Sequence, residues 1–159
     1  MRLLSLSALA LAVGTLAGCA TVEPGMTRDQ VVAAWGAPTR QVPLAGGERL
    51  QYSRQPEGQQ VTMVDLDAAG RVAQVRPVMT ATEFARIATD GSWTRADVER
   101  EFGPAPDHER VASWDGPILT YRWRDGGVDL FYWVYLDQAG IVRRAHQGMD
   151  WRNMRQVRP

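Results

Sequence analysis

The chain has 159 residues, of which 45% are hydrophobic, and its 18 basic residues, all arginine, balance its 18 acidic residues. This length suits one ordinary domain or two very small ones. The zero net charge argues against a nucleic-acid-binding protein, because such proteins carry an excess of basic residues.

The first residues form a targeting signal. One arginine precedes an apolar run, Leu3–Leu16, that is too short to span a bilayer. The run closes on LAGC, in which small residues precede Cys19, the one cysteine of the chain. This pattern predicts a lipoprotein signal peptide at residues 1–18, acylation of Cys19 and a lipidated tether at residues 19–24. An ordinary signal peptide with an incidental cysteine is the alternative. By the sorting rule of enteric bacteria, Ala20 favours the periplasmic face of the outer membrane.

The sequence GMTRDQVVAAWGAP, soon after the tether, predicts a short helix. Thr27 and Gln30 have the spacing of a capping box, in which each side chain bonds a free backbone N–H at the start of the helix. Val31 and Trp35 lie one helical turn apart and share an apolar stripe. Gly36, followed by a proline, ends the helix.

A second form of this phrase, GSWTRADVEREFGPAP, occurs 67 positions later and predicts a second helix. Thr94 repeats the N-cap, and Asp97 approximates the capping box. Val98 and Phe102 repeat the apolar pair, and Gly103 repeats the terminating glycine. A further helix is expected at residues 82–88, without a counterpart earlier in the chain.

Each repeated helix is followed by segments with the pattern of antiparallel strands. They are expected at residues 39–42, 48–54, 61–67 and 71–75, and again at 107–113, 119–124, 128–137 and 141–145. The sequence therefore predicts an α+β fold of two tandem helix-plus-antiparallel-β-meander repeats, with the helices on one face of a curved sheet. The repeats span residues 25–77 and 78–146, and a basic C-terminal tail spans residues 147–159, which is either solvated or lies on anionic lipid.

The candidate binding surface lies in LTYRWRDGGVDLFYWVYLD, near the end of the second repeat. If Gly126 and Gly127 form a two-residue turn, Asp125 pairs with Val128, and one face of the hairpin becomes wholly apolar. The buried face would hold Leu119, Tyr121, Trp123, Leu130, Tyr132, Val134 and Leu136. The opposite face shows aromatic rings framed by arginines, the residue types that protein interfaces concentrate. The candidate protein-binding residues are Arg122, Arg124, Phe131, Trp133 and Tyr135. Alternatively, the tail or the first repeat covers this row.

No pattern for catalysis or cofactor binding occurs, so we expect neither an enzyme nor a cofactor. His108 and His146 stand in different contexts, and the chain has no H-E-x-x-H, no G-x-S-x-G and no phosphate loop. The string DLDAAG begins like a calcium loop, but Ala69 and Arg76 fill positions that require oxygen ligands. We therefore expect a hairpin turn there and no metal site.

GMTRDQVVAAWGAP, LQYSR and DLDAAGRV together resemble the SmpA/OmlA (BamE-like) outer-membrane lipoprotein domain. Residues 25–75 match it well, and residues 80–145 match it as a looser second copy. The tandem arrangement is similar to the fold of the β-lactamase inhibitory protein. The resemblance implies an α+β fold, an envelope location and a supporting role in the machinery that assembles β-barrel proteins.

The leading functional hypothesis is a lipoprotein anchored to the outer membrane through acylated Cys19. Its tandem domain would act as a non-catalytic protein-binding scaffold, with envelope proteins such as the β-barrel assembly machinery as partners and no nucleic acid. The alternative is an inhibitor that clamps an exposed loop of a hydrolase, such as a β-lactamase or a lysozyme.

Overall fold

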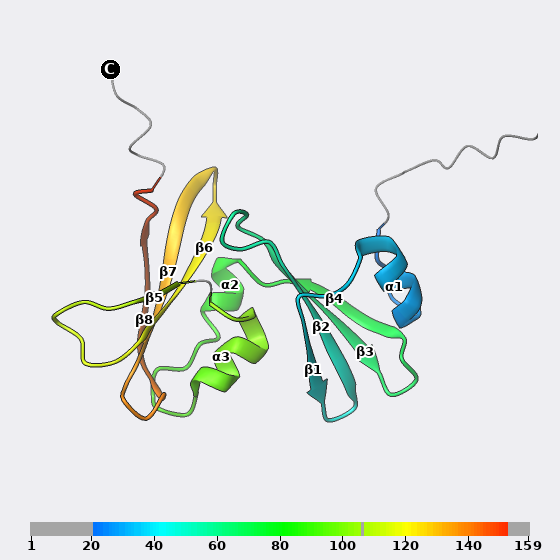
Figure 1. The fold of residues 1–159 in the computed structure, drawn as a ribbon, viewed down its shortest axis with the longest axis horizontal. Helices are drawn as coiled ribbons and strands as arrows, with labels where there is room; N and C mark the ends of the chain where they lie inside the picture. The colour runs from blue at the N-terminus through cyan, green and yellow to red at the C-terminus, as the bar shows by residue number, and fades with distance from the viewer. Residues whose placement is uncertain (1–20, 106, 153–159) are drawn as a thin grey trace, which may run out of the picture.

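A computed structural model describes residues 21–152 apart from residue 106, and in this part the chain forms an α+β fold dominated by strands (Figure 1). The elements of the first half are α1 (Arg28–Trp35), β1 (Arg40–Leu44), β2 (Gly47–Ser53), β3 (Val61–Asp67) and β4 (Val72–Pro77). Those of the second half are α2 (Ala81–Phe84), α3 (Arg95–Phe102), β5 (Asp107–Glu109), β6 (Ile118–Asp125), β7 (Val128–Leu136) and β8 (Val142–Met149). No helix among these described residues is long and apolar enough to cross a membrane.

The strands form two antiparallel four-stranded sheets, β1-β2-β3-β4 and β5-β6-β7-β8, each a meander in chain order. Two expected elements are shorter than the sequence pattern indicated. The helix expected at residues 82–88 is the single turn α2, and the strand expected at residues 107–113 ends at Glu109. The residues after β5 instead form a loop that projects from the end of the second sheet (Figure 1).

Both repeated helices start with the capping box expected from the sequence. The backbone N–H of Thr27 donates to the Gln30 side chain at 2.8 Å, and that of Thr94 donates to Asp97 at 2.8 Å. The aspartate therefore completes the box, although it is one methylene shorter than the usual glutamate. Hydrogen bonds from Thr94, first through its side chain and then through its backbone, lower the pKa of Asp97.

The two halves hold helix and sheet together with matching hydrogen bonds. The Tyr52 hydroxyl donates to the Gly36 carbonyl at 3.1 Å, and the Tyr121 hydroxyl donates to the Gly103 carbonyl at 2.8 Å. Burial raises the pKa of Tyr121, so this phenol stays protonated and continues to donate.

The string that begins like a calcium loop forms the turn between β3 and β4. One oxygen of the Asp67 carboxylate accepts from the backbone N–H groups of Ala69 and Arg71, both at 2.9 Å. Asp137 accepts in the same way from Ala139 and Ile141 between β7 and β8. The expected hairpin turn is confirmed, and the same aspartate stabilises it in each half.

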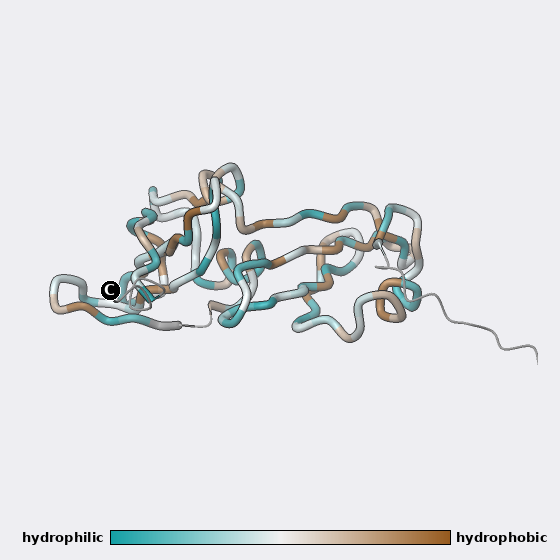
Figure 2. Tube along the Cα trace, turned by 90° about the horizontal axis from the view of Figure 1, so that it is seen from above, coloured by the Kyte–Doolittle hydropathy of each residue, from teal (hydrophilic) through white to brown (hydrophobic). Residues whose placement is uncertain are grey.

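The first core lies between α1 and one face of the first sheet. It is built from Val31, Leu50, Val64, Leu66 and Val72, all of them buried. In the view of Figure 2, hydrophobic and hydrophilic stretches alternate along the chain in both halves. That alternation is expected of strands that pack one face on a core.

The second core fills the space between the two sheets. Phe84 of α2 and Phe102 of α3 pack on the inner face of the second sheet, and their rings stack at 5.2 Å. Val61 and Met63, which belong to β3 of the first sheet, are buried in the same cluster. The two halves therefore share one hydrophobic core.

This arrangement corrects the expectation of one curved sheet with helices on one face. The described strands form two separate sheets, and helices lie on both faces of the first: α1 on one side, α2 and α3 on the other (Figure 1). The reason lies in β3, where Val64 and Leu66 face α1 while Val61 and Met63 face the second half. A sheet with apolar residues on both faces must be covered on both.

Candidate functional site: the outer face of the second sheet

The β6–β7 hairpin has the register expected from the sequence. Asp125 pairs with Val128, and Arg122 pairs with Phe131. Gly126 and Gly127 have φ values of 52° and 86°, as a primed two-residue turn requires. The apolar face is turned toward the helices as predicted, with Leu119, Tyr121, Trp123, Val134 and Leu136 buried and Leu130 and Tyr132 packed beside them.

The opposite face, which we call the outer aromatic face, consists of side chains from β7, β8, the β5–β6 loop and the segment after β8. Its members are Trp114, Phe131, Trp133, Tyr135, Arg144, His146, Trp151 and Arg152. They form a continuous series of ring contacts across the second sheet.

One end of this face is covered by the beginning of the C-terminal tail. Phe131 is fully buried, with the Trp151 ring 5.9 Å away and the Arg152 guanidinium 5.0 Å from its ring centre. Trp151 itself is 50% exposed. The alternative that the C-terminal tail covers the aromatic row is therefore correct for Phe131. At this end of the face, the exposed ring is that of Trp151.

The middle of the face is the half-buried ring of Trp133. A methyl group at Gly148 would lie 2.5 Å from the Trp133 ring. The missing side chain of this β8 glycine therefore makes room for the ring. The indole nitrogen of Trp133 and the hydroxyl of the neighbouring Thr120 are both buried without a hydrogen-bond partner among the described residues. Shape, rather than a polar contact, therefore fixes this ring.

The other end is a stack of polar aromatic groups. His146 lies 3.0 Å from the Tyr135 hydroxyl, and the two rings stack with centres 5.3 Å apart. Arg144, which is exposed, lies 5.0 Å from the Tyr135 ring centre, and Trp114 meets the same ring edge-on at 5.3 Å. A cation thus lies over a ring at each end of the face.

The two predicted arginines have different environments. Arg122 is mostly buried and bonds Asp150 at 2.8 Å and the Pro56 carbonyl at 2.7 Å, so it joins the tail, the second sheet and the first half. The Gln55 side chain also bonds the backbone of Arg122 in both directions, at 3.1 Å each. Arg124 pairs with Asp129 at 2.7 Å, and its side chain is 59% exposed.

The structure thus places all five predicted residues on one side of the hairpin, but Arg122 and Phe131 support the surface from within. The sequence analysis missed Trp114, Arg144, His146, Trp151 and Arg152. The strand alternation of β8 could have indicated two of them, since Arg144 and His146 lie directly across from Tyr135 and Trp133. The predicted lipidation site, Cys19, lies outside the described residues.

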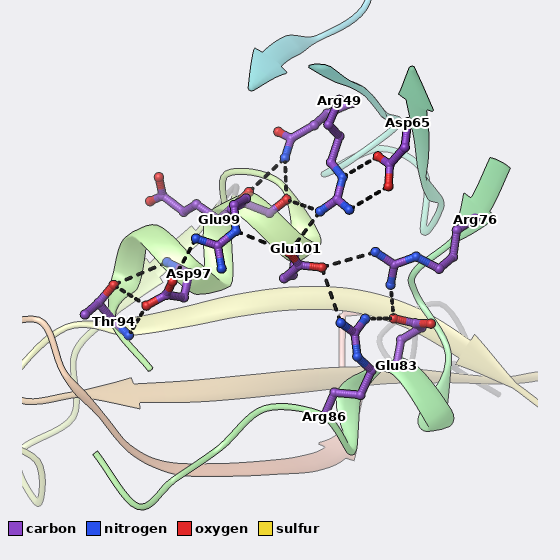
Figure 3. A network of polar contacts seen from close by, with 11 residues as sticks. Arg49, Asp65, Arg76, Glu83, Arg86, Thr94, Asp97, Glu99 and Glu101 are labelled. Carbon is purple, nitrogen blue, oxygen red and sulfur yellow. Dashed lines mark hydrogen bonds and ion pairs between the residues drawn. The ribbon is translucent and has the colours of Figure 1, made fainter. Parts of the chain in front are cut away.

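A buried polar network fixes the second half against the first (Figure 3). Arg49 of β2 bonds both carboxylate oxygens of Asp65, at 2.6 and 2.8 Å, and pairs with Glu101 of α3 at 3.0 Å. Arg76 joins Glu101 to Glu83 of α2. Burial opposes ionisation of Glu101, but the charge of Arg49 and hydrogen bonds from Arg76, Arg49 and Arg100 together lower its pKa.

The same strand also caps the end of α3. The Gln51 side chain donates to the carbonyls of Glu99 and Arg100 at 2.9 and 3.0 Å, and Arg49 donates to the Arg100 carbonyl at 3.1 Å. These carbonyls lie in the last turn of α3, where few backbone N–H groups remain to bond them; the Glu99 carbonyl also accepts from the backbone N–H of Gly103. A positive side chain there is also favoured by the helix dipole. The first half thus holds the helix that supports the second sheet.

Among the described residues, no group of three or more His, Cys, Asp or Glu side chains is arranged to hold a metal ion. The candidate site consists of aromatic rings and arginine side chains on the outer face of the second sheet.

No protein-family model and no curated protein matches the chain. Among solved structures, the chain is similar to the DUF4309 family protein YjgB of Bacillus subtilis, with 18% identity over 78% of each chain and a TM-score of 0.32. The expected membership of the SmpA/OmlA (BamE-like) family is wrong, because no family model matches the chain. Two of the three phrases on which the resemblance rested, the capped helix and the β3–β4 turn, carry local backbone signals that also occur in unrelated folds, and LQYSR belongs mostly to β2.

Proposed function

We propose that the chain is a non-catalytic protein-binding scaffold, anchored by acylated Cys19 to the periplasmic face of the outer membrane. The observation that supports binding is the outer aromatic face, with exposed Trp151 and Arg144 at its two ends. The specific role in β-barrel assembly rested on the SmpA/OmlA resemblance and is not part of this proposal.

We also infer that the two halves are tandem copies of one helix-plus-meander unit. The capping boxes, the tyrosine–glycine bonds and the aspartate turns support this, because each occurs in both halves at equivalent positions. A second copy added to the first gives a sheet whose inner face is covered by its own helices. Its outer face then becomes available for another role.

The chemistry of the outer aromatic face suits a protein partner. Tryptophan, tyrosine and arginine are enriched among the few residues that carry most of the binding energy in protein interfaces. The rings are already fixed by the sheet, by Gly148 and by the Arg122–Asp150 pair, so binding requires little further ordering. The cations at both ends favour a partner surface with carboxylates.

A photo-crosslinking amino acid in place of Arg144 tests the binding role, with the same group in place of exposed Asp29 of α1 as the matched control. We expect protein adducts in intact cells from position 144 and none from position 29. Equal adduct patterns at the two positions, or no adduct at position 144 where known envelope complexes are captured, would contradict the proposal.

The anchor is tested separately by Cys19→Ser. We expect the protein to move from the membrane fraction to the soluble periplasmic fraction, because the acyl chains need the cysteine. Membrane association that is unchanged in this variant would contradict lipid anchoring without bearing on the outer aromatic face.

The hydrolase inhibitor remains the alternative hypothesis. It requires an exposed finger between the two units, and the loop that lies there is bonded to β6 through Gln55, Pro56 and Gln59. This contact favours the scaffold. Assays against a panel of β-lactamases and lysozymes decide the matter, and no inhibition by micromolar protein would eliminate the inhibitor.

A further inference from the structure

In the second half, the short helix α2 fills a box of aromatic rings. Phe84 stacks on Tyr132 with ring centres 4.0 Å apart and on Phe102 at 5.2 Å, and it meets Trp123 edge-on at 5.3 Å. Tyr121 completes the box at 6.4 Å. This one inserted side chain closes the second core between its helix and its sheet.

The residues at the equivalent positions of the first half line an open groove of about 560 Å³. The matching hydrogen bonds relate Tyr52 to Tyr121, and the strand registers relate Thr62 to Tyr132. The same alignment relates Trp35 to Phe102 and Arg54 to Trp123. All four counterparts of the residues around Phe84 lie in the groove lining.

The sequence of the first half offers no aromatic counterpart of Phe84 for this groove. At the offset that relates Val31 to Val98, Phe84 corresponds to Ala17, and residues 1–20 contain no aromatic residue. Ala17 also falls within the predicted signal peptide, which processing would remove.

The groove combines an aromatic wall with a cation. Trp35 and Tyr52 form an edge-on pair with centres 5.3 Å apart. Arg54 stands where the second half has Trp123, and its exposed guanidinium has no hydrogen bond or ion pair within the described part of the chain. A second hollow of about 670 Å³ shares Arg54, Gln60 and Thr62, so the groove is long enough for several residues of a peptide.

We propose that this groove binds a short segment of another protein that inserts an aromatic side chain against Trp35 and Tyr52 and places a neighbouring carboxylate on Arg54. The aromatic side chain follows from the position that Phe84 occupies in the second half. The carboxylate follows from the unpaired charge of Arg54, since a charged hydrogen bond forms there without breaking an existing one. This site is separate from the outer aromatic face.

The test titrates the purified full-length chain with a synthetic peptide of residues 80–86, TATEFAR, in which glutamate precedes phenylalanine. The comparison peptides carry Phe84→Ala or Glu83→Gln. We expect the parent peptide to shift the indole N–H signal of Trp35 in NMR spectra and to leave Trp114 and Trp151 unshifted. The Phe84→Ala peptide should bind at least tenfold more weakly.

Two protein variants test whether the charge of Arg54 contributes to peptide binding. Arg54→Glu should weaken binding of the parent peptide at least tenfold, while Arg110→Glu, an exposed arginine on the second half, should leave it unchanged. Arg54→Trp combined with Thr62→Tyr rebuilds the lining around Phe84. This variant should bind the parent peptide more tightly and no longer distinguish it from the Glu83→Gln peptide.

Equal binding of the Phe84→Ala and parent peptides, no binding of either at millimolar concentration, or shifts confined to Trp114 and Trp151 would each overturn the proposal. Loss of adducts from position 144 in the crosslinking experiment would leave it intact, because that experiment reports on a different surface.

Discussion

At the residue scale, glycine fixes the closest approach between neighbouring strands. A methyl group added to Gly47 would lie 1.9 Å from the Leu66 carbonyl oxygen, and one added to Gly116 would lie 2.1 Å from that of Leu136. The obstacle in both cases is backbone, which cannot rotate away as a side chain can. Gly47 is the first residue of β2, and Gly116 lies two residues before β6.

We therefore expect Gly47→Ala to lower the free energy of unfolding by about 2–4 kcal/mol, because the β2–β3 pair must separate to admit the methyl group. Gly46→Ala is the matched control, since nothing lies within 4 Å of its added methyl group. Urea unfolding curves of the two variants would give the comparison. A similar loss of unfolding free energy in both variants would show that the close contact at Gly47 does not cause the destabilisation.

A second expectation at this scale concerns Glu101. Its pKa is lowered in the folded protein, so the unfolded state binds more protons in acid. Its contribution to stability is complete above the ordinary glutamate pKa and is lost as the pH falls through the lower folded value. Glu101→Gln should lower stability at pH 7 by roughly 1–3 kcal/mol and should flatten the loss of stability below about pH 4.5.

Unfolding midpoints in urea at pH 7 and in the acid range measure both effects. Glu57→Gln, at an exposed position outside the network, serves as the control and should follow the parent protein at every pH. An equally steep fall of stability below about pH 4.5 in Glu101→Gln and in the parent protein would contradict the proposed contribution of ionised Glu101 to stability.

At the scale of elements, the two longer helices are short and depend on side chains that bond the backbone groups at their ends. Helices α1 and α3 have eight residues each, too few to be stable alone in water. Capping boxes satisfy their first N–H groups, and α3 also has its last carbonyls bonded by Arg49 and Gln51. Sequence could reveal the first device because it is local, but not the second, which joins residues about 50 positions apart.

We expect Thr94→Ala to lower the free energy of unfolding by about 1–2 kcal/mol through loss of the N-cap. The pKa of Asp97 should rise toward its ordinary value, because the hydrogen bond from the Thr94 side chain is the main cause of its lowering. An NMR titration of the Asp97 carboxyl carbon follows this change. Thr94→Ser should restore both quantities, and a failure of serine to do so would argue against the hydroxyl as the cause.

At the scale of the whole molecule, the two sheets are joined by a core and by a charged network at the same boundary. Met63 belongs to the first sheet but is fully buried among the residues of the second core. Arg49 and Arg76 cross the same boundary to Glu101. Such contacts favour a single cooperative unfolding transition over two independent ones.

We expect Met63→Ala to lower the free energy of unfolding by about 2–4 kcal/mol and to shift the whole transition, with faster amide exchange in β6 and β7 as well as in β3. Met149→Ala, at a side chain that is 51% exposed, is the control and should change little. Calorimetry and hydrogen exchange together test this. Two resolved transitions, of which only the first moves, would show that the halves unfold separately.

The sequence by itself determined the local elements. Thr27 and Thr94 marked the helix starts, Gly126 and Gly127 set the hairpin register, and one aspartate in each half marked a turn. These signals involve residues a few positions apart, so the caps and turns can form through local interactions that do not depend on the rest of the fold.

The tertiary structure alone decided how these elements assemble. The strand pattern was compatible with one extended sheet or with two sheets that have helices between them, and the packing of Val61 and Met63 against α2 and α3 selected the second arrangement. The same packing drew Arg122 into contact with Pro56 and Asp150, away from a partner. Several apolar surfaces could pack together in this chain. The pairs that do so depend on the shape and charge of segments distant in sequence, and local sequence patterns do not reveal that match.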